Sequence, residues 1–417
     1  RSVGFPPNHP PMHSFLGVPV MTRGVAFGNL YLAEKQPAGS FTEEDEETVT
    51  LLAAQAAVAI ENAGENEFVR MHLVGNASIG AGDAAIVRRQ GRAADAEAGR
   101  ARAAHPDGRR HLVEGGVEIV PQTQLANGDV DFALAWVPKA LASREAGADI
   151  VNIAQIFQRS GTLQVSFKDS NIATSADFKG KKIGNWGYGN EFEIFAALTK
   201  AGLDPAKDVT LVQQQFDMAG LLSGDIDAAE AMTYNEYAQV LEAINPATGA
   251  LYTADDFNVV SYEAEGVGML QDAIWADGSR LEDPAYVETA TKFVAASIQG
   301  WAFCRDNAQA CTDIVVAKGS KLGATHQLWQ MNEVNKLIWP APAGVGMIDE
   351  AAWSRTVDLS QNAKNLEGGT VLTKAPDAAA HTNEIVTAAL ALLTEKGIDI
   401  NGAAFAPITV TLTEGGN

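Results

Sequence analysis

Short apolar runs alternate with helical stretches along most of the chain after Gly115. Each apolar run is bounded by turn residues, which is typical of strands, and the predicted strands are 117–121, 129–136, 149–157, 181–186, 208–215 and 225–233. From about Glu282 the pattern is mostly helical, with predicted helices at 283–303, 308–317 and 325–338. Two successive α/β units followed by returning helices predict an α/β fold of two lobes around a cleft.

The first 63 residues follow a different pattern, strand–strand–helix. "FLGVPV" and "VAFGNLYLAEK" are predicted strands. Phe41 to Ala63 is a predicted helix that Thr42 opens, with acidic residues in its first turn. This segment predicts a small α+β unit that precedes the larger α/β part.

Residues 64–114 match neither neighbour. Eight of the fifteen arginines lie between Arg70 and Arg110, a window without lysine, and large apolar residues are few there. Such a composition predicts a linker without a packed core. It is also what a high-GC reading frame yields when translated out of phase, so we expect either a basic linker or a joining artefact, and favour the artefact.

The net charge of the chain limits the classes of partner that it could bind. The 417 residues carry a formal net charge of −22, with 46% hydrophobic and 20% charged residues. This composition is typical of a globular protein, and its acidity argues against nucleic acid and anionic membranes as partners. The sequence starts at Arg1, so its beginning says nothing about a signal peptide.

One strand-to-helix turn carries candidate binding chemistry. In "KKIGNWGYGNEFEIFAAL", residues 181–198, Gly187 and Gly189 allow a close backbone approach, Tyr188 stands at the rim, and a predicted helix starts at Glu191. Helix-start N–H groups favour an anionic or acceptor-rich ligand. An ordinary turn is the alternative when this stretch is taken alone.

The third segment resembles a known family. "GDVDFALAWVPKALASREAGADIVNIAQIFQRSG", "DFKGKKIGNWGYGNEFEIFAAL" and "LLSGDIDAAEAMTYNEY" are similar to solute-binding proteins of ABC importers, in the branch that binds thiamine pyrimidine precursors, alkanesulfonates or nitrate. The resemblance covers residues 115–417, without the family's first strand–helix–strand. It implies a type II periplasmic-binding-protein fold with a second lobe at about 175–262 and a first lobe formed by the remainder. It also implies an extracytoplasmic location and an ABC permease as partner.

In this family the ligand lies between the lobes, where strand-to-helix turns meet it. The resemblance therefore implies a small-molecule site in three turns. The expected ligand-binding residues are Trp136, Tyr188, Gly189, Asn190, Thr233, Tyr234, Asn235 and Glu236. Aromatic faces suit a flat ring, and Glu236 would accept hydrogen bonds from amino groups while repelling an oxyanion. We expect an aminopyrimidine whose polar tail lies near the N–H groups of Gly189 and Asn190, with alkanesulfonate or nitrate as alternatives.

An enzyme of the same fold branch, a eukaryotic thiamine pyrimidine synthase, is a further alternative. That enzyme has a lysine and a histidine in the turn that matches "LAWVPK", where this chain has Ala135 and Lys139. It also has a cysteine-rich run where residues 262–275 hold no cysteine. Lys139 is expected to be a partly exposed, solvated side chain. The sequence therefore predicts a binding protein with no catalytic residues, metal or cofactor.

The first segment resembles the C-terminal half of a GAF domain from haem-based sensor histidine kinases. The likeness rests on "HPPMHSFLGVPV", "FGNLYL" and "FTEEDEETVTLLAAQAAVAIENA". It places His9 at the family's proximal haem-ligand position and Tyr31 on the distal side. Half a pocket leaves a macrocycle largely in water, so we expect weak haem binding or none. A GAF-containing sensor, of cytoplasmic origin for this fragment, is the remaining alternative function.

The chain holds two cysteines, Cys304 and Cys311, in "WAFCRDNAQACTDIV". They flank a predicted turn between two helices. A local disulfide is expected, which would suit an oxidising compartment, and two buried thiols are the alternative.

Overall fold

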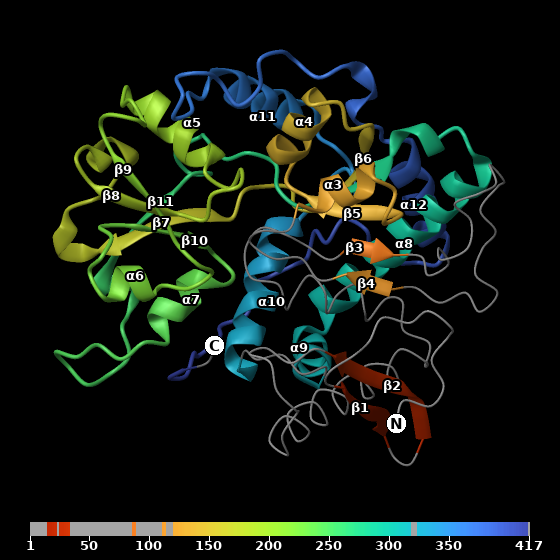
Figure 1. Ribbon diagram of the computed structural model, residues 1–417, viewed down its shortest axis with the longest axis horizontal. Helices are drawn as coiled ribbons and strands as arrows, with labels where there is room; N and C mark the ends of the chain where they lie inside the picture. The colour runs from red at the N-terminus through yellow and green to blue at the C-terminus, as the bar shows by residue number, and fades with distance from the viewer. Residues whose placement is uncertain are drawn as a thin grey trace. The chain divides into compact units, whose positions relative to one another are not determined.

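The computed structural model describes residues 15–22, 25–33, 86–88, 111–113, 120–317 and 323–415, and the side chains of 120–317 and 323–415. The chain divides into two compact units, Arg1–Glu67 and Phe68–Asn417. Figure 1 draws the described elements of both. His9, the predicted helix 41–63 and most of the arginine-rich segment lie outside the described residues.

The first unit contains an antiparallel pair of strands, β1 (Phe15–Thr22) and β2 (Val25–Ala33). Both strands were predicted from sequence. Tyr31 pairs with Gly17 in this register.

The second unit is α/β, as predicted. Its strands are β3 (Ile86–Arg88), β4 (His111–Val113), β5 (Phe132–Ala135), β6 (Ile150–Gln155), β7 (Thr162–Phe167), β8 (Lys182–Asn185), β9 (Thr210–Gln213), β10 (Ala229–Met232), β11 (Phe257–Ser261) and β12 (Ala273–Asp277). Its α-helices are α3 (Pro121–Ala126), α4 (Val137–Glu145), α5 (Phe192–Ala201), α6 (Ala219–Leu222), α7 (Glu236–Leu241), α8 (Pro284–Asp306), α9 (Ala308–Ala317), α10 (Ala324–Ile338), α11 (Glu350–Asn362) and α12 (Glu384–Glu395). The 3-10 turns are η1 (Lys168–Ser170), η2 (Ser175–Phe178), η3 (Ala254–Asp256), η4 (Gly278–Arg280) and η5 (Ala378–Ala380).

The first lobe is built on a five-stranded sheet in the order β4-β3-β5-β12-β6. Alternate side chains of β5 face opposite sides of the sheet, because successive strand residues point to opposite faces. Phe132 and Leu134 pack with α8, α10 and α12, whereas Ala133 and Ala135 pack towards α4 and α11. Strands β5, β6 and β12 are therefore buried between two helical layers (Figure 1).

The second lobe holds a sheet of order β10-β7-β11 and the parallel pair β8-β9, in which Ile183 forms a bridge with Ala228, the residue before β10. Helix α5 packs on one side through Ile194, Phe195 and Leu198. Helices α6 and α7 pack on the other side. Two chain segments join the lobes, one between β6 and β7 and one between β11 and β12.

Three expectations change. The predicted strand 117–121 does not reach Pro121, because Pro121 starts α3, where its fixed φ suits the first helical position. The second lobe's sheet includes β7, so that lobe starts before residue 175. Within 64–114, expected to lack packed structure, β3 and β4 extend the first-lobe sheet, where the aliphatic Ile86 and Leu112 suit strands.

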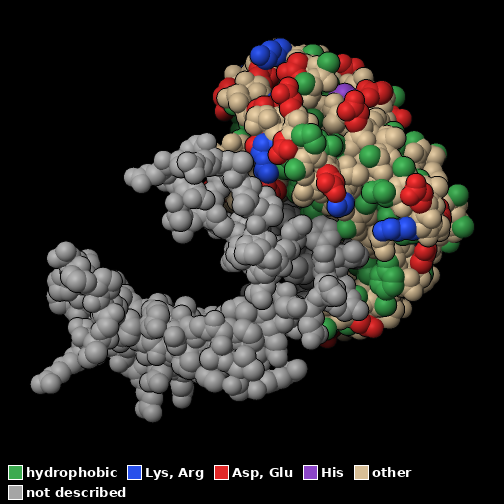
Figure 2. Space-filling model, turned by 90° about the vertical axis from the view of Figure 1, so that its right-hand side faces the viewer, with side chains coloured by type: hydrophobic (Ala, Val, Ile, Leu, Met, Phe, Trp, Pro, Cys, Tyr) green, Lys and Arg blue, Asp and Glu red, His purple; other side chains and the backbone are tan. Residues whose placement is uncertain are grey.

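Cys304 near the end of α8 and Cys311 in α9 form a disulfide across Asn307, with Cα atoms 5.5 Å apart. Figure 2 shows Asp and Glu side chains scattered over the described face, with fewer Lys and Arg, which accords with the net charge.

Candidate functional site

The glycine-rich turn 186–190 of the second lobe follows β8. Gly187, Tyr188 and Gly189 all have positive φ, at 74°, 55° and 92°. Three successive left-handed residues reverse the chain sharply, and glycine adopts this conformation without a steric penalty. A Cβ atom at Gly189 would lie 2.9 Å from Lys139 Cγ. The glycine is therefore required because the first lobe approaches the turn closely.

The backbone N–H groups of this turn are not available in the way the sequence suggested. The Gly189 N–H donates to Glu191 Oε2 at 2.9 Å, and the Asn190 N–H donates to the Gly187 carbonyl at 3.1 Å. Both amides expected to hold a polar ligand tail thus have partners within the turn. The predicted placement of that tail is wrong for this conformation.

Lys139 lies in the first turn of α4 and reaches across to the second lobe. Its Nζ donates to Asn190 Oδ1 at 3.4 Å, and its side chain is buried. The expectation of a partly exposed, solvated lysine is therefore wrong. Because α4 packs on the first-lobe sheet, this contact joins the first lobe to the turn 186–190.

Two tryptophans and a tyrosine form the apolar part of the interlobe region. Trp136 precedes α4, Trp186 follows β8 and Tyr234 follows β10, and all three are buried in one apolar cluster. The Tyr234 ring stands edge-on to Phe157 at 6.1 Å between ring centroids. Tyr188, by contrast, is 53% exposed. Trp136 and Tyr234 thus belong to the same buried cluster, whereas Tyr188 lies at the surface and Trp186, also in the cluster, was missed.

Trp186 could have been found from sequence. It is the last residue of the predicted strand 181–186, at the edge where open α/β sheets bind ligands. The glycines beside it drew the prediction to Tyr188 instead.

Several buried polar atoms around this cluster have no hydrogen-bond partner within the described part of the chain. They are Trp136 Nε1, Trp186 Nε1, Glu230 Oε1, Thr233 Oγ1, and both amide atoms of Gln327 and of Gln330. Buried polar groups in folded proteins are nearly always paired, so such a group needs an explanation. A concentration of them between two lobes is expected of a site that takes its partners from a ligand.

Connections in the structure place these groups around one region. Met232, on the same face of β10 as Glu230, belongs to the cluster that contains both tryptophans. Trp329 Nε1 donates to the Thr233 carbonyl at 2.9 Å, which brings α10 against the turn after β10. Gln327 and Gln330 lie on this helix, together with the cluster members Met331 and Val334.

The turn after β10 is held by buried polar contacts. The carboxylate of Glu236 accepts from the Met232 N–H at 2.9 Å and from Asn235 Nδ2 at 2.8 Å. Asn235 Oδ1 lies 2.9 Å from His326 Nε2. Asn235 and Glu236 are thus buried and locked in place rather than solvated at a helix start.

The electrostatics of the region are dominated by buried carboxyl groups. Desolvation raises the pKa of Glu236 to about 7 and that of Glu230 well above its usual value, and neighbouring glutamates raise the latter further. Desolvation also raises the pKa of Glu191 and, to about 7, that of Glu193. A region rich in carboxyl groups disfavours a second anion.

The two interlobe connections are cross-linked by Gln271. Its Oε1 accepts from the Gly161 N–H at 2.9 Å, and its Nε2 donates to Ser160 Oγ at 3.1 Å and to Glu193 Oε2 at 3.3 Å. Glu193 also accepts from the Met269 N–H. Every polar atom of the Gln271 amide thus has a protein partner, which makes the hinge a structural network.

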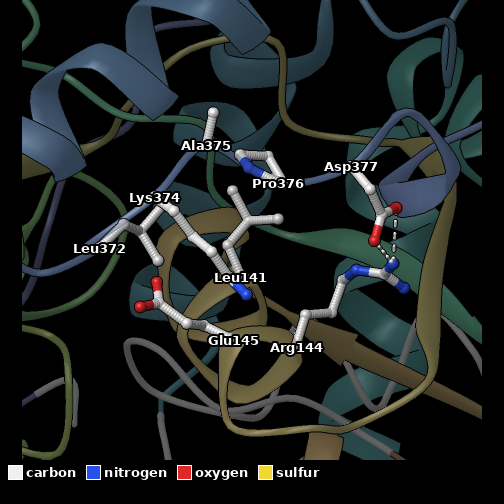
Figure 3. A pocket seen from close by; sticks show the side chains of 8 residues that line it. All are labelled: Leu141, Arg144, Glu145, Leu372, Lys374, Ala375, Pro376 and Asp377. Atoms are coloured by element: carbon white, nitrogen blue, oxygen red, sulfur yellow. Dashed lines mark hydrogen bonds and ion pairs between the residues drawn. The ribbon is translucent and has the colours of Figure 1, made fainter.

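A separate cavity of about 260 Å³ lies between α4 and the segment after α11 (Figure 3). Its lining residues are Leu141, Arg144, Glu145, Leu372, Lys374, Ala375, Pro376 and Asp377. The Arg144 guanidinium donates to both Asp377 oxygens at 2.9 and 3.1 Å, and Glu145 accepts from the Thr373 N–H. None of the predicted ligand residues lines this cavity, and three of its charged groups, Arg144, Glu145 and Asp377, already have protein partners.

The described residues contain no group of His, Cys, Asp or Glu side chains that could hold a metal ion. Within the same residues, no helix is long and apolar enough to cross a membrane.

Comparison with known proteins confirms both family resemblances. Residues 111–310 match the family model described as NMT1/THI5 like, and residues 1–61 match the GAF domain model. A putative thiamine biosynthesis protein of Haemophilus influenzae is 27% identical over 154 residues, which are 36% of this chain and 48% of that protein. The chain thus spans about half the length of this curated relative.

Two solved structures align with most of this chain. A protein from Bordetella bronchiseptica RB50 aligns with a TM-score of 0.50 and 18% identity, over 67% of this chain and 86% of that one. The periplasmic aliphatic sulphonate binding protein SsuA from Escherichia coli aligns with a TM-score of 0.43 and 16% identity, over 73% and 82%. The first of these supports the two-lobed α/β fold inferred from the sequence.

Proposed function

We propose that residues 115–417 form the solute-binding component of an ABC importer and hold a small ligand between the two lobes. The observation that carries this proposal is the set of unpartnered buried polar atoms around Trp136 and Trp186. These groups would be costly in a protein that never filled the region. The NMT1/THI5-like match and the fold support the same class. An extracytoplasmic location and a membrane permease as partner follow from that class.

For the ligand we propose a neutral aminopyrimidine of the thiamine-precursor type. The two indole N–H groups are donors, Thr233 and the glutamines can donate or accept, and Glu230 and Glu236 offer carboxyl oxygens. Such a mixed set suits a flat ring that carries both ring-nitrogen acceptors and an amino donor. The relative described as a putative thiamine biosynthesis protein points the same way.

An alkanesulfonate or nitrate fits less well. The ammonium of Lys139 is already directed to Asn190, and buried glutamates surround the region. An oxyanion there would lie at short range from carboxyl groups, and any of them that ionises would repel it strongly at low dielectric. This argument concerns charge, so it separates anions from neutral heterocycles rather than one heterocycle from another.

We propose binding rather than catalysis for this site. Glu230 and Lys139 are buried, and the contacts described for them are to protein groups. The candidate residues supply hydrogen bonds and aromatic faces, which is the chemistry of recognition.

The test is calorimetric titration and thermal shift of the full chain with three probes, the aminopyrimidine alcohol that forms half of thiamine, taurine and nitrate. The aminopyrimidine is expected to raise Tm most, and Trp136→Ala should reduce the shift. Lys374→Ala, in the separate cavity of Figure 3, is the matched control and should leave the shift unchanged. A larger shift with taurine or nitrate would refute the proposed ligand and leave the binding-protein class standing.

A further inference from the structure

A chain of four buried side chains runs from the first-lobe helix α10 into the predicted ligand turn. His326 Nδ1 lies 2.9 Å from Glu242 Oε2, and His326 Nε2 lies 2.9 Å from Asn235 Oδ1. Asn235 Nδ2 in turn donates to Glu236 Oε1 at 2.8 Å. At most 2% of each residue's surface is exposed. The chain therefore exchanges little with solvent, and each member constrains the next.

The hydrogen bonds of this chain have a direction. Asn235 gives its N–H to Glu236, so its carbonyl oxygen faces the histidine and can only accept. His326 Nε2 must therefore carry a proton in this arrangement. Glu236 then needs no proton of its own, because it accepts from both Asn235 and the Met232 N–H.

If the donors and acceptors between His326, Asn235 and Glu236 are reversed, every hydrogen bond among them can still form. If the Asn235 amide turns over, its Nδ2 donates to a bare His326 Nε2 and its Oδ1 faces Glu236. Glu236 then needs a proton to donate to that oxygen. The proton count is unchanged, since the proton that leaves His326 Nε2 is the one that Glu236 gains. If Glu242 is ionised it can only accept, so Nδ1–H donates to it in both arrangements, and His326 is then an imidazolium in the first arrangement and neutral in the second.

We propose that His326 is a positioning residue for the ligand site: by donating from Nε2 it fixes the Asn235 amide and holds Glu236 as an ionised acceptor rather than a protonated donor. The inference rests on the proposed function, in which Asn235 and Glu236 meet the ligand. The inference adds a specificity determinant about 90 residues after Glu236 in sequence, on helix α10, which contains none of the ligand residues predicted from sequence. Burial raises the pKa of Glu236 to about 7, so its two forms are close in free energy near neutral pH and a neighbouring hydrogen bond can select between them.

The two arrangements favour different ligands. An ionised Glu236 accepts from an amino N–H, whereas a protonated one donates to an oxo group. The experiment is therefore a ratio of two affinities, measured by calorimetry on the full chain. The probes are the thiamine aminopyrimidine alcohol and the same ring with an oxo group in place of its amino group.

The variants separate direction from packing. His326→Gln keeps a side-chain N–H near Asn235 and should retain the wild-type ratio, which we expect to favour the amino ligand by at least about tenfold. His326→Leu removes the donor and should bring the ratio close to one. His381→Gln is the matched control, because His381 pairs with Glu350 and takes no part in the hydrogen bonds between Glu242, His326, Asn235 and Glu236. If His326→Leu lowers both affinities equally and keeps the ratio, the residue is only structural and the inference is refuted.

Two further measurements keep the outcome decisive. If His326→Leu does not fold, Asn235→Asp removes the N–H that Glu236 accepts and should lower the same ratio, and an unchanged ratio would refute the inference. Nitrogen NMR of histidine-labelled wild-type chain, without ligand, should show a proton on Nε2 of the slowly exchanging buried histidine, and a bare Nε2 would overturn the assigned direction. This measurement decides the chain's direction even if neither pyrimidine binds, an outcome that would refute only the proposed function.

Discussion

Two buried polar regions lie close together between the lobes, and they differ in how completely their side chains are paired. At the hinge, the Gln271 amide reaches Ser160, Gly161, Thr162 and Glu193. Around the two tryptophans, the amides of Gln327 and Gln330 are equally buried yet have no partner within the described residues. Burial alone therefore does not mark a ligand site. The completeness of hydrogen bonding separates groups that hold the fold from groups that await a partner.

The largest expected effect comes from making one substitution in both regions. Gln271→Leu would leave the buried Gly161 N–H without its partner and would remove one donor to the Glu193 carboxyl, so we expect a loss of about 3–5 kcal/mol in the free energy of unfolding. Gln330→Leu removes an already unpaired amide and should change this free energy by less than about 1 kcal/mol. It should nevertheless weaken ligand binding.

Urea unfolding followed by tryptophan fluorescence measures this difference, because all seven tryptophans lie between Trp136 and Trp353 and report only the second unit. Equal losses in the two variants would contradict the distinction between the regions.

The pH dependence of stability tests both regions at once. Burial raises the pKa of Glu193 at the hinge and of Glu236 at the ligand turn to about 7. A raised carboxyl pKa means that the folded state binds the proton more tightly than the unfolded state. This contribution is therefore complete below about pH 4.5 and is lost as pH rises towards 7. Each group accounts for roughly 3 kcal/mol.

Glu193→Gln and Glu236→Gln should each flatten the decline in urea midpoint between pH 5 and 8. Glu236→Gln should also reduce aminopyrimidine binding, whereas Glu193→Gln should affect binding only through the hinge. A wild-type protein that becomes more stable over this pH range would show that burial does not set these pKa values.

Much of the fold could be predicted from sequence, and less of the site. Apolar periodicity predicts strands β5, β6, β8 and β10 and helices α8 to α10. The residues that form the packing face of each of these elements are close together in sequence, so the pattern is visible there. The turns 186–190 and 233–236 could be located as well. The sequence could not show which groups in these turns are already paired, because their partners are distant in sequence. Asn190 is paired with Lys139, and Asn235 is paired with His326. The α10 glutamines were missed for the same reason, whereas Trp186 was missed because the glycines beside it drew the prediction to Tyr188.

A smaller effect should follow from removing an indole N–H in each environment. Trp275 Nε1 donates to the Ala135 carbonyl at 3.0 Å inside the first lobe, so Trp275→Phe loses a buried hydrogen bond as well as volume. Trp186→Phe loses similar volume but no hydrogen bond to a described residue. We expect Trp275→Phe to lower the free energy of unfolding by about 1 kcal/mol more than Trp186→Phe does. We expect Trp186→Phe to weaken ligand binding more than Trp275→Phe does. Reversal of either order would count against Trp186 as a ligand residue.

The smallest expected effect on stability is at the threonines, where the substitution to valine preserves shape and removes only the hydroxyl. Thr356 Oγ1 accepts from the Leu270 N–H and donates to the Ala352 carbonyl, both at 2.9 Å, beside the segment that joins the lobes. Thr356→Val leaves the Leu270 N–H buried without that partner, which should cost about 1–2 kcal/mol. Thr233→Val removes a hydroxyl with no partner among the described side chains and backbone, so the free energy of unfolding should stay within about 0.5 kcal/mol of wild type. Its effect should appear in calorimetric titration, as a severalfold weaker aminopyrimidine affinity at unchanged stability. A Thr233→Val protein that is as destabilised as Thr356→Val would show that this hydroxyl serves the fold, and would remove it from the ligand site.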